Sequence, residues 1–202
     1  DVNFIKNGWI NRNRLLFGQD VKYFTIPLSG GSSFAKINQV KVQAEGVWRK
    51  KIADSVRFSY GKSPYFPVVF DLFSSVLFAE ETSIASFAAR SVMAISEYLG
   101  LETEFIQSST CYDNNELKGV DRVIDICRRE GATQYLNLPG GKDLYDEDLF
   151  RFHGIALEFI DSVATPYPQN SSEFVPNLSI IDVAMFNDCC AIREMLSAKV
   201  SA

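Results

Sequence analysis

The sequence is poor in the features that mark metal centres, disulfide frameworks and membrane spans. Its 202 residues include one histidine and four cysteines, and the cysteine spacing fits neither a zinc site nor a disulfide framework. No apolar run approaches the roughly 20 residues that a membrane-spanning helix needs. Glycine-rich phosphate-loop and dinucleotide-binding spacings are also missing, which leaves any cofactor unknown. These absences favour a cytoplasmic protein with no metal site and no membrane span.

Length and apolar content suit one compact domain, residues 1–202. Hydrophobic residues make up 47% of the chain and aromatic residues 13%, as in a globular enzyme or binding domain. The net charge of −5 is uneven, because residues 1–62 carry 11 Lys or Arg against 4 Asp or Glu. This excess is either scattered surface charge or a local anion site, and it is too small for a nucleic-acid groove.

Alternating strand-like and helical segments predict an α/β fold. Thr103–Gln107, 133–137 and 155–160 have the composition of strands, and helical patterns lie between them at 116–129 and after Asp146. This β-α-β-α-β order predicts a mostly parallel, Rossmann-like sheet flanked by helices.

The domain is predicted to have two parts. The first, residues 1–80, is a small basic β-hairpin with helices, and the second, residues 81–202, holds the β-α-β-α-β unit and the C-terminal helices. Apolar spacing and turn residues place further strands at 22–28 and 37–43, and helices at 47–60, from Pro64, at 83–99 and from Ser179.

Parallel sheets bind ligands at the carboxyl ends of their strands, which directs attention to two turns. Gly140, Gly141 and Lys142 follow the second predicted strand, where backbone amides and an ammonium group could hold a phosphate. The same turn could exist for steric reasons alone. Ser108 and Ser109 occupy the equivalent position after the first predicted strand, as ligand contacts or as a helix cap.

A polar cluster near the start of the chain is the other candidate site. Asn11, Arg12, Asn13 and Arg14 place two guanidinium groups and two amides within four residues. Arginine binds phosphate or carboxylate groups bidentately, and asparagine both donates and accepts hydrogen bonds. The alternative is that these side chains bridge carbonyls and acids on the surface.

Motifs along nearly the whole chain resemble one known family. In order they are Trp9-Ile-Asn-Arg-Asn-Arg14, Phe24-Thr-Ile-Pro-Leu28, Trp48-Arg-Lys-Lys51, Thr133-Gln-Tyr-Leu136, Gly140-Gly-Lys142, Tyr145-Asp-Glu147, Tyr167-Pro-Gln169 and Phe174-Val-Pro-Asn-Leu-Ser-Ile-Ile-Asp182. Their order and spacing resemble the WbqC-like proteins of bacterial surface-polysaccharide gene clusters.

The resemblance implies a cytoplasmic protein that helps to make an O-antigen, a capsule or a similar glycan. It implies a transferase that moves an acyl or aminoacyl group to a nucleotide-linked amino sugar, with a homo-oligomer as one possible assembly. An ATP-using activating enzyme and a non-catalytic sugar-nucleotide binding module remain alternatives. In this scheme Asp182 is the candidate base, and the ligand-binding residues are Asn11, Arg12, Asn13, Arg14, Ser108, Ser109, Gly140, Gly141, Lys142, Tyr145 and Gln169.

Two departures from the family pattern affect these expectations. Members of the family typically begin with a strand and a Gln-Pro-x-Tyr-x-Pro motif, which this sequence lacks, so we expect about thirty residues before Asp1 in the natural protein. Thr165 stands where the family often has histidine, so no catalytic role for that histidine is carried over.

Overall fold

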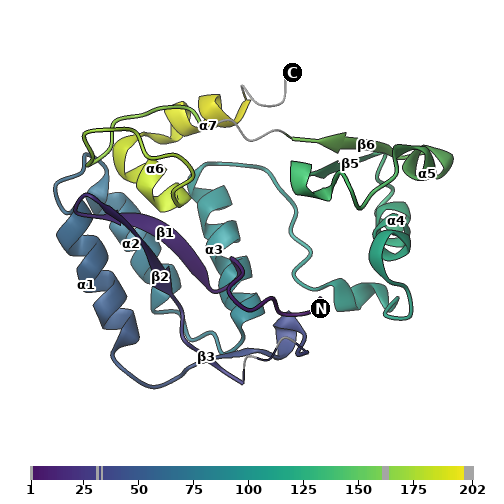
Figure 1. Ribbon diagram of the computed structural model, residues 1–202, viewed down its shortest axis with the longest axis horizontal. Helices are drawn as coiled ribbons and strands as arrows, with labels where there is room; N and C mark the ends of the chain where they lie inside the picture. The colour runs from purple at the N-terminus through teal and green to yellow at the C-terminus, as the bar shows by residue number, and fades with distance from the viewer. Residues whose placement is uncertain (1, 31, 33, 161–163, 198–202) are drawn as a thin grey trace. The chain divides into compact units, whose positions relative to one another are not determined.

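The structure, a computed structural model, describes residues 2–30, 32, 34–160 and 164–197. Within these residues the fold is mixed α/β, with seven α-helices and three two-stranded sheets (Figure 1). The chain forms two compact units, one of residues 1–107 and 164–195 and the other of residues 108–163 and 196–202. Among the described residues, no helix has both the length and the apolar character needed to cross a bilayer. The expected single domain stays a prediction.

An antiparallel hairpin opens the first unit. Strand β1(Arg12–Phe17) pairs with β2(Asp20–Thr25) across a two-residue turn, in which Gly18 has a φ of +71°. Glycine adopts this left-handed conformation without the steric cost that a side chain would add. A shorter pair follows, with β3(Leu28–Ser29) antiparallel to β4(Lys41–Val42).

The expected hairpin of 22–28 with 37–43 is therefore only partly correct. Most of its first strand belongs to β2, whose partner is β1, and residues 37–39 form the short 3-10 helix η1(Ile37–Gln39). Pro27 lies just after β2 and lacks the N–H that a continuing ladder would use, so the chain leaves this sheet there.

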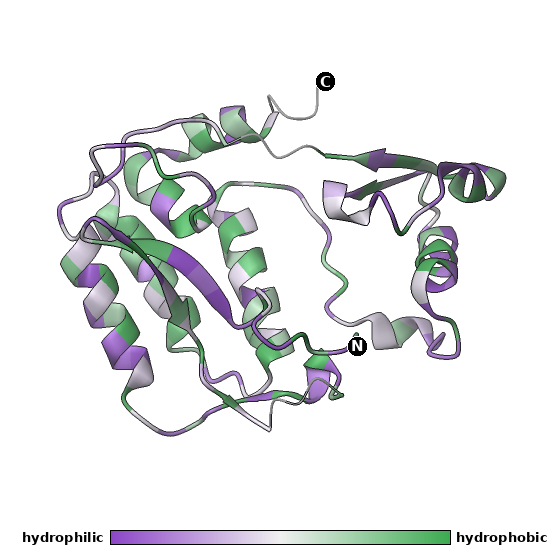
Figure 2. Cartoon of the chain, in the orientation of Figure 1, coloured by the Kyte–Doolittle hydropathy of each residue, from purple (hydrophilic) through white to green (hydrophobic). Residues whose placement is uncertain are grey.

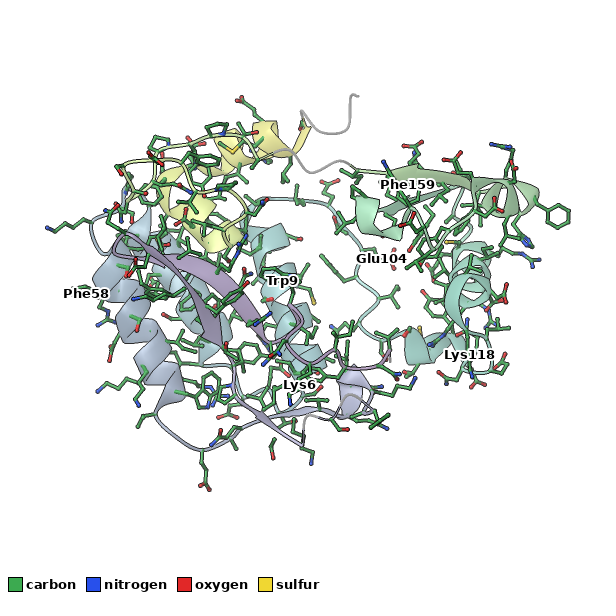
Figure 3. All side chains as sticks on the ribbon, viewed as in Figure 1. Lys6, Trp9, Phe58, Glu104, Lys118 and Phe159 are labelled. Carbon is green, nitrogen blue, oxygen red and sulfur yellow. The ribbon has the colours of Figure 1, made fainter. Side chains whose placement is uncertain are left out.

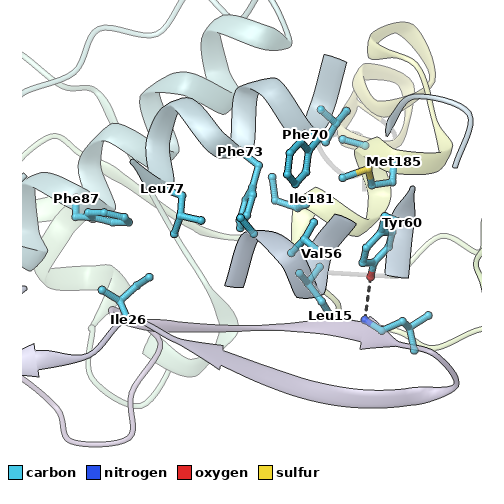
Figure 4. Close-up of a cluster of buried hydrophobic side chains, with 14 of the residues drawn as sticks. Leu15, Ile26, Val56, Tyr60, Phe70, Phe73, Leu77, Phe87, Ile181 and Met185 are labelled. Atoms are coloured by element: carbon cyan, nitrogen blue, oxygen red, sulfur yellow. Dashed lines mark hydrogen bonds between the residues drawn. The ribbon is translucent and has the colours of Figure 1, made fainter. Parts of the chain in front are cut away.

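Five helices complete the first unit and cover its core: α1(Trp48–Tyr60), α2(Phe66–Leu77), α3(Ile84–Tyr98), α6(Ile180–Phe186) and α7(Cys189–Ser197). The helices predicted at 47–60, from Pro64, at 83–99 and from Ser179 are confirmed. Helix α2 contacts α1, α3 and α6, and β1 contacts α1 and α6. Buried side chains such as Leu15, Val56, Phe73 and Met185 meet between these elements (Figure 4).

The second unit is built on one parallel strand pair. Strands β5(Gln134–Asn137) and β6(Ala156–Phe159) pair in register from Gln134 with Ala156 to Asn137 with Phe159. The other elements are η2(Ser109–Tyr112), α4(Gly119–Arg129), η3(Pro139–Gly141) and α5(Glu147–Phe152). Figure 2 shows hydrophilic and hydrophobic residues alternating along the helices, and α4 and α5 supply Ile124, Cys127 and Phe150 to a small core.

The strand predicted at Thr103–Gln107 is not formed. These residues have no regular structure and are mostly exposed. Glu102 and Glu104 interrupt the apolar run, and a strand needs a neighbour to satisfy its backbone groups. The expected β-α-β-α-β unit is thus a single β-α-β step, and a Rossmann-like parallel sheet is not confirmed.

Candidate functional site

Asp182, the predicted base, is fully buried in the first unit. It lies in the first turn of α6, which begins after the capping side chain of Ser179. The Tyr60 hydroxyl donates to its Oδ2 at 2.6 Å, and the Tyr167 hydroxyl donates to its Oδ1 at 2.7 Å. The Gln169 side-chain amide also donates to Oδ1, at 3.2 Å. Both carboxylate oxygens therefore have donors inside the protein.

The hydrogen bonds of Asp182 extend to two further parts of the unit. The backbone N–H of Leu16 in β1 donates to the Tyr60 hydroxyl oxygen at 2.9 Å (Figure 4). The Gln169 side chain bonds both backbone groups of Val175, accepting at 2.8 Å and donating at 3.1 Å. This Asp182 network consists of Tyr60, Tyr167, Gln169 and Asp182, and it joins α1, β1, α6 and the segment before α6.

The two tyrosines of the Asp182 network are held in their protonated form. Burial raises the pKa of the Tyr60 hydroxyl well above its usual value, and the adjacent Asp182 carboxylate raises it further. Burial and the hydrogen bond to Asp182 likewise raise the pKa of Tyr167. A group that must stay protonated is a dependable donor at neutral pH. In this geometry Asp182 is a buried hydrogen-bond acceptor that links α6 to α1 and to the segment before α6. Its role as a base stays a prediction.

Two of the four N-terminal candidates, Arg12 and Arg14, lie on one face of the hairpin. Alternation along β1 places them on the same side, and Tyr23 stands directly opposite Arg14 in β2. The Arg12 guanidinium carbon is 4.5 Å from the centre of the Tyr23 ring, and that of Arg14 is 5.6 Å from the Trp9 ring. We call Trp9, Arg12, Arg14 and Tyr23 the Arg–aromatic face; Figure 3 labels Trp9.

Backbone carbonyls are the hydrogen-bond acceptors for both guanidinium groups. Arg12 donates to the carbonyls of Gly8, at 3.1 Å, and Asn7, and Arg14 donates to that of Asn177 at 2.5 Å. The Nε of Arg14 is buried and has no acceptor among the described residues. No described carboxylate pairs with Arg12 or Arg14 either, so the described residues leave both positive charges without an ion pair.

The other two N-terminal candidates use their amides within the hairpin. The Asn11 side chain donates to the Ile26 carbonyl at 3.0 Å, beside a bond from the Ile26 N–H to the Asn11 carbonyl at 2.7 Å. The Asn13 side chain accepts from the N–H of Arg14 at 2.8 Å. These contacts favour a structural role for both asparagines.

The serine candidates belong to the second unit and do not follow a strand. The Ser108 hydroxyl accepts from the Thr110 N–H at 3.3 Å and lies 2.8 Å from the Thr110 hydroxyl, so it caps η2. Ser109 is the first residue of η2, and its carbonyl accepts from Arg122 at 3.4 Å. Of the two roles expected for Ser108, a ligand contact or a helix cap, its geometry is that of a helix cap.

The glycine-lysine turn uses two of its amides internally. The N–H of Gly141 donates to the Leu138 carbonyl at 2.9 Å, and that of Lys142 donates to the Pro139 carbonyl at 3.1 Å. Both bonds belong to η3, so neither amide points to a ligand as the phosphate hypothesis requires. The Lys142 side chain is exposed, and its ammonium lies 5.7 Å from the Phe159 ring.

Close packing explains the second glycine of this turn. A Cβ at Gly141 would lie 2.4 Å from Nδ2 of Asn137 and 3.2 Å from the Tyr145 ring, whereas a Cβ at Gly140 would meet nothing within 4 Å. Tyr145 itself packs edge-on against Tyr135 and Phe150. Gly141 and Tyr145 are thus parts of the small core, which favours the steric explanation.

The second unit also contains a cavity of about 400 Å³ between α5 and β6. Its lining residues are Thr133, Glu147, Arg151 and 154–158, and it includes none of the predicted ligand residues. Across the described part of the chain, no three His, Cys, Asp or Glu residues are grouped so that they could hold a metal ion.

The family model that describes the WbqC-like protein family matches residues 1–194. The chain belongs to the WbqC-like family. It is also similar to the uncharacterized protein Rv1507c of Mycobacterium tuberculosis, with 27% identity over 190 residues, which cover 93% of this chain and 80% of that protein. No solved structure matches the chain. The family resemblance is confirmed, and the similar protein's printed description assigns no activity.

Sequence reasoning missed Trp9, Tyr23 and Tyr60 in this WbqC-like protein. Trp9 is part of a motif, but only the pairing of β1 with β2 brings Tyr23 beside it and the arginines. Tyr60 is 122 residues from Asp182, and no local pattern indicates that the two meet. Tyr167 also belongs to a motif, although its donor role was not expected.

The packing at the turn predicts unequal effects of two alanine substitutions. Gly141→Ala should lower the free energy of unfolding by about 1–2 kcal/mol, because the new Cβ displaces Asn137 and Tyr145. Gly140→Ala is the matched control, with open space for a Cβ, and should change it by less than about 0.5 kcal/mol. Urea unfolding of the two variants measures the difference, and equal midpoints would contradict the steric explanation.

The raised pKa values of Tyr60 and Tyr167 predict how stability depends on pH. Replacing both by Phe should cost about 1–3 kcal/mol at neutral pH, because Asp182 loses its hydroxyl donors. Each tyrosine hydroxyl has a higher pKa in the folded protein than in the unfolded chain, where it is about 10. The stabilisation that this difference gives to the folded state is complete below about pH 10 and is lost as the pH rises above it. The difference in the free energy of unfolding between the wild type and the double variant should therefore become smaller above about pH 10.

Urea unfolding between about pH 7 and 11 tests this narrowing. Tyr23→Phe, on the half-exposed hairpin face, is the control for replacing a hydroxyl outside the network. The single variant Tyr167→Phe gives a milder form in case the double variant does not fold. A gap that stays constant across this range would show that the two hydroxyls do not keep their protons in the folded state.

Proposed function

We propose that this WbqC-like protein binds a nucleotide-linked amino sugar at the Arg–aromatic face and transfers an acyl or aminoacyl group to its amine. One observation carries the binding step: Arg12 and Arg14 lie together without a described carboxylate partner, beside two exposed aromatic rings. The proposed setting is the cytoplasm, in surface-glycan biosynthesis, as the family resemblance implies.

The phosphates of a nucleotide sugar have the chemistry that this face needs. Guanidinium groups bind phosphate with paired, charge-assisted hydrogen bonds. No described carboxylate competes with a phosphate for either guanidinium group, because their acceptors are backbone carbonyls. Stacking on Trp9 and Tyr23, together with the carbonyl contacts, holds both guanidinium groups in place before a ligand arrives.

In the proposed transfer, the sugar amine attacks the acyl carbonyl of a donor. A nitrogen–carbon bond forms, the donor's leaving group departs, and the amine loses a proton. Asp182 is the candidate acceptor for that proton. Because its carboxylate is buried beneath Tyr167 and Gln169, this role requires the segment that carries those two residues to move away.

A binding module without catalysis is the second candidate function. The observation that favours it is that Asp182, the candidate base, is fully buried and that both of its oxygens accept hydrogen bonds from the protein. The Arg–aromatic face can bind and position a phosphorylated ligand without reacting with it.

Substituting Arg12 and Arg14 tests the binding step in the full-length protein. Arg14→Ala and Arg12→Ala should each raise the Kd for a nucleoside-diphosphate amino sugar about 10–100-fold, because each removes charged hydrogen bonds. Lys50→Ala, an exposed cation of the same unit, is the control and should leave Kd unchanged. Calorimetry measures the affinities, and unchanged binding in both arginine variants would refute the proposed site.

Mass spectrometry of the same mixtures distinguishes the candidate reactions. With an acyl donor, a gain of mass on the sugar without ATP supports the transferase. Consumption of ATP supports an activating enzyme, and tight binding without turnover supports the binding module.

A further inference from the structure

The aromatic half of the Arg–aromatic face is unusually open to solvent. Trp9 is 60% exposed and Tyr23 is 47% exposed, and their ring centres are 5.9 Å apart. Large aromatic side chains are buried when they serve only to fill a core. Two neighbouring exposed rings therefore offer surface to something outside the unit.

Other exposed aromatic residues do not share this arrangement. Phe34 and Phe58 are 92% and 91% exposed, yet within the described residues neither contacts another ring or a guanidinium group. Single exposed apolar side chains are normal on protein surfaces. Trp9 differs because it combines an exposed ring, an aromatic neighbour and the cation of Arg14.

We infer that Trp9 is the stacking platform for the base of a nucleoside diphosphate whose phosphates contact Arg12 and Arg14. The inference rests on the proposed ligand binding at this face and deepens it by assigning the part of the ligand that Trp9 recognises. A nucleotide joins a flat, apolar ring to phosphates through one ribose, and this face joins a flat, exposed indole to two cations.

The same geometry predicts little discrimination between bases. The side-chain amides of Asn11 and Asn13, the sequence neighbours of Arg12 and Arg14, are hydrogen-bonded to the backbone of the hairpin. Stacking alone is tolerant of base identity, because every base has an aromatic surface. Uridine and adenosine diphosphates should therefore bind with similar affinity.

Trp9 and Trp48 are the two tryptophans of the chain, so fluorescence can report on Trp9 directly. In the Trp48→Phe variant of this 202-residue chain, Trp9 is the single indole, and UDP, ADP and inorganic pyrophosphate are titrated against it. UDP and ADP should quench its fluorescence and bind about tenfold or more tightly than pyrophosphate, because they add stacking. Pyrophosphate should bind without comparable quenching.

Substitution of Trp9 separates stacking from charge. Trp9→Leu should weaken UDP binding about tenfold more than pyrophosphate binding, because both ligands lose the support that Trp9 gives to Arg14 but only UDP also loses stacking. Trp9→Phe should restore part of the affinity for UDP. If UDP and pyrophosphate bind equally and Trp9→Leu alters neither, the stacking platform is refuted while the anion site stands. If neither compound binds the wild-type protein, both the inference and the proposed binding face are wrong.

Discussion

The first unit depends on one buried charge. The Asp182 carboxylate is fully enclosed, and removing an ionised group from water is costly unless hydrogen bonds compensate it. Tyr60 and Tyr167 supply that compensation from segments far apart in the sequence, one from the end of α1 and one from the segment before α6. Each donor can reach the carboxylate only when its own element is in place, so the network makes the positions of these elements interdependent.

This interdependence extends to the Arg–aromatic face. The Tyr60 hydroxyl accepts the N–H of Leu16, which fixes β1 against α1. The N–H of Ser179, at the start of α6, donates to the Arg14 carbonyl at 2.9 Å, and the Arg14 side chain reaches Asn177. A substitution at Asp182 would therefore shift Arg14 as well. Loss of ligand binding in such a variant would not identify Asp182 as a base.

Local rules account for the helices and fail where distant segments meet. Ser83 and Ser179 cap α3 and α6. Apolar spacing predicts both ends of α3 closely and the start of α6, because helical hydrogen bonds are local, but it does not predict the end of α6 at Phe186. The strand Arg12–Phe17 was not predicted, since its opening Arg-Asn-Arg sequence has little strand preference and its pairing depends on the turn at Gly18. The opposite error occurs at Thr103–Gln107, where a strand was predicted from strand-like residues but, among the described residues, no neighbouring strand pairs with them.

For the candidate site, too, the sequence predicted individual residues but not their contacts with residues far away in the chain. Sequence alone identified Arg12 and Arg14 as cations but not the rings that orient them. It also identified Asp182 but not the donors that enclose it.

Other arginines of the protein show which partners a guanidinium group has in this fold. Arg90 lies 3.0 Å from Glu81, and Arg129 lies 2.9 Å from Asp125. Arg49 instead stacks on the Trp48 ring and donates to the Leu77 carbonyl, the same kinds of partner that Arg12 and Arg14 have. At the Arg–aromatic face the described residues provide rings and carbonyls but no anion. The face differs from the site of Arg49 because two guanidinium groups share it, and neither a ring nor a carbonyl is an anion. A bound phosphate would neutralise both charges, which is the reason to expect a phosphorylated ligand at this face.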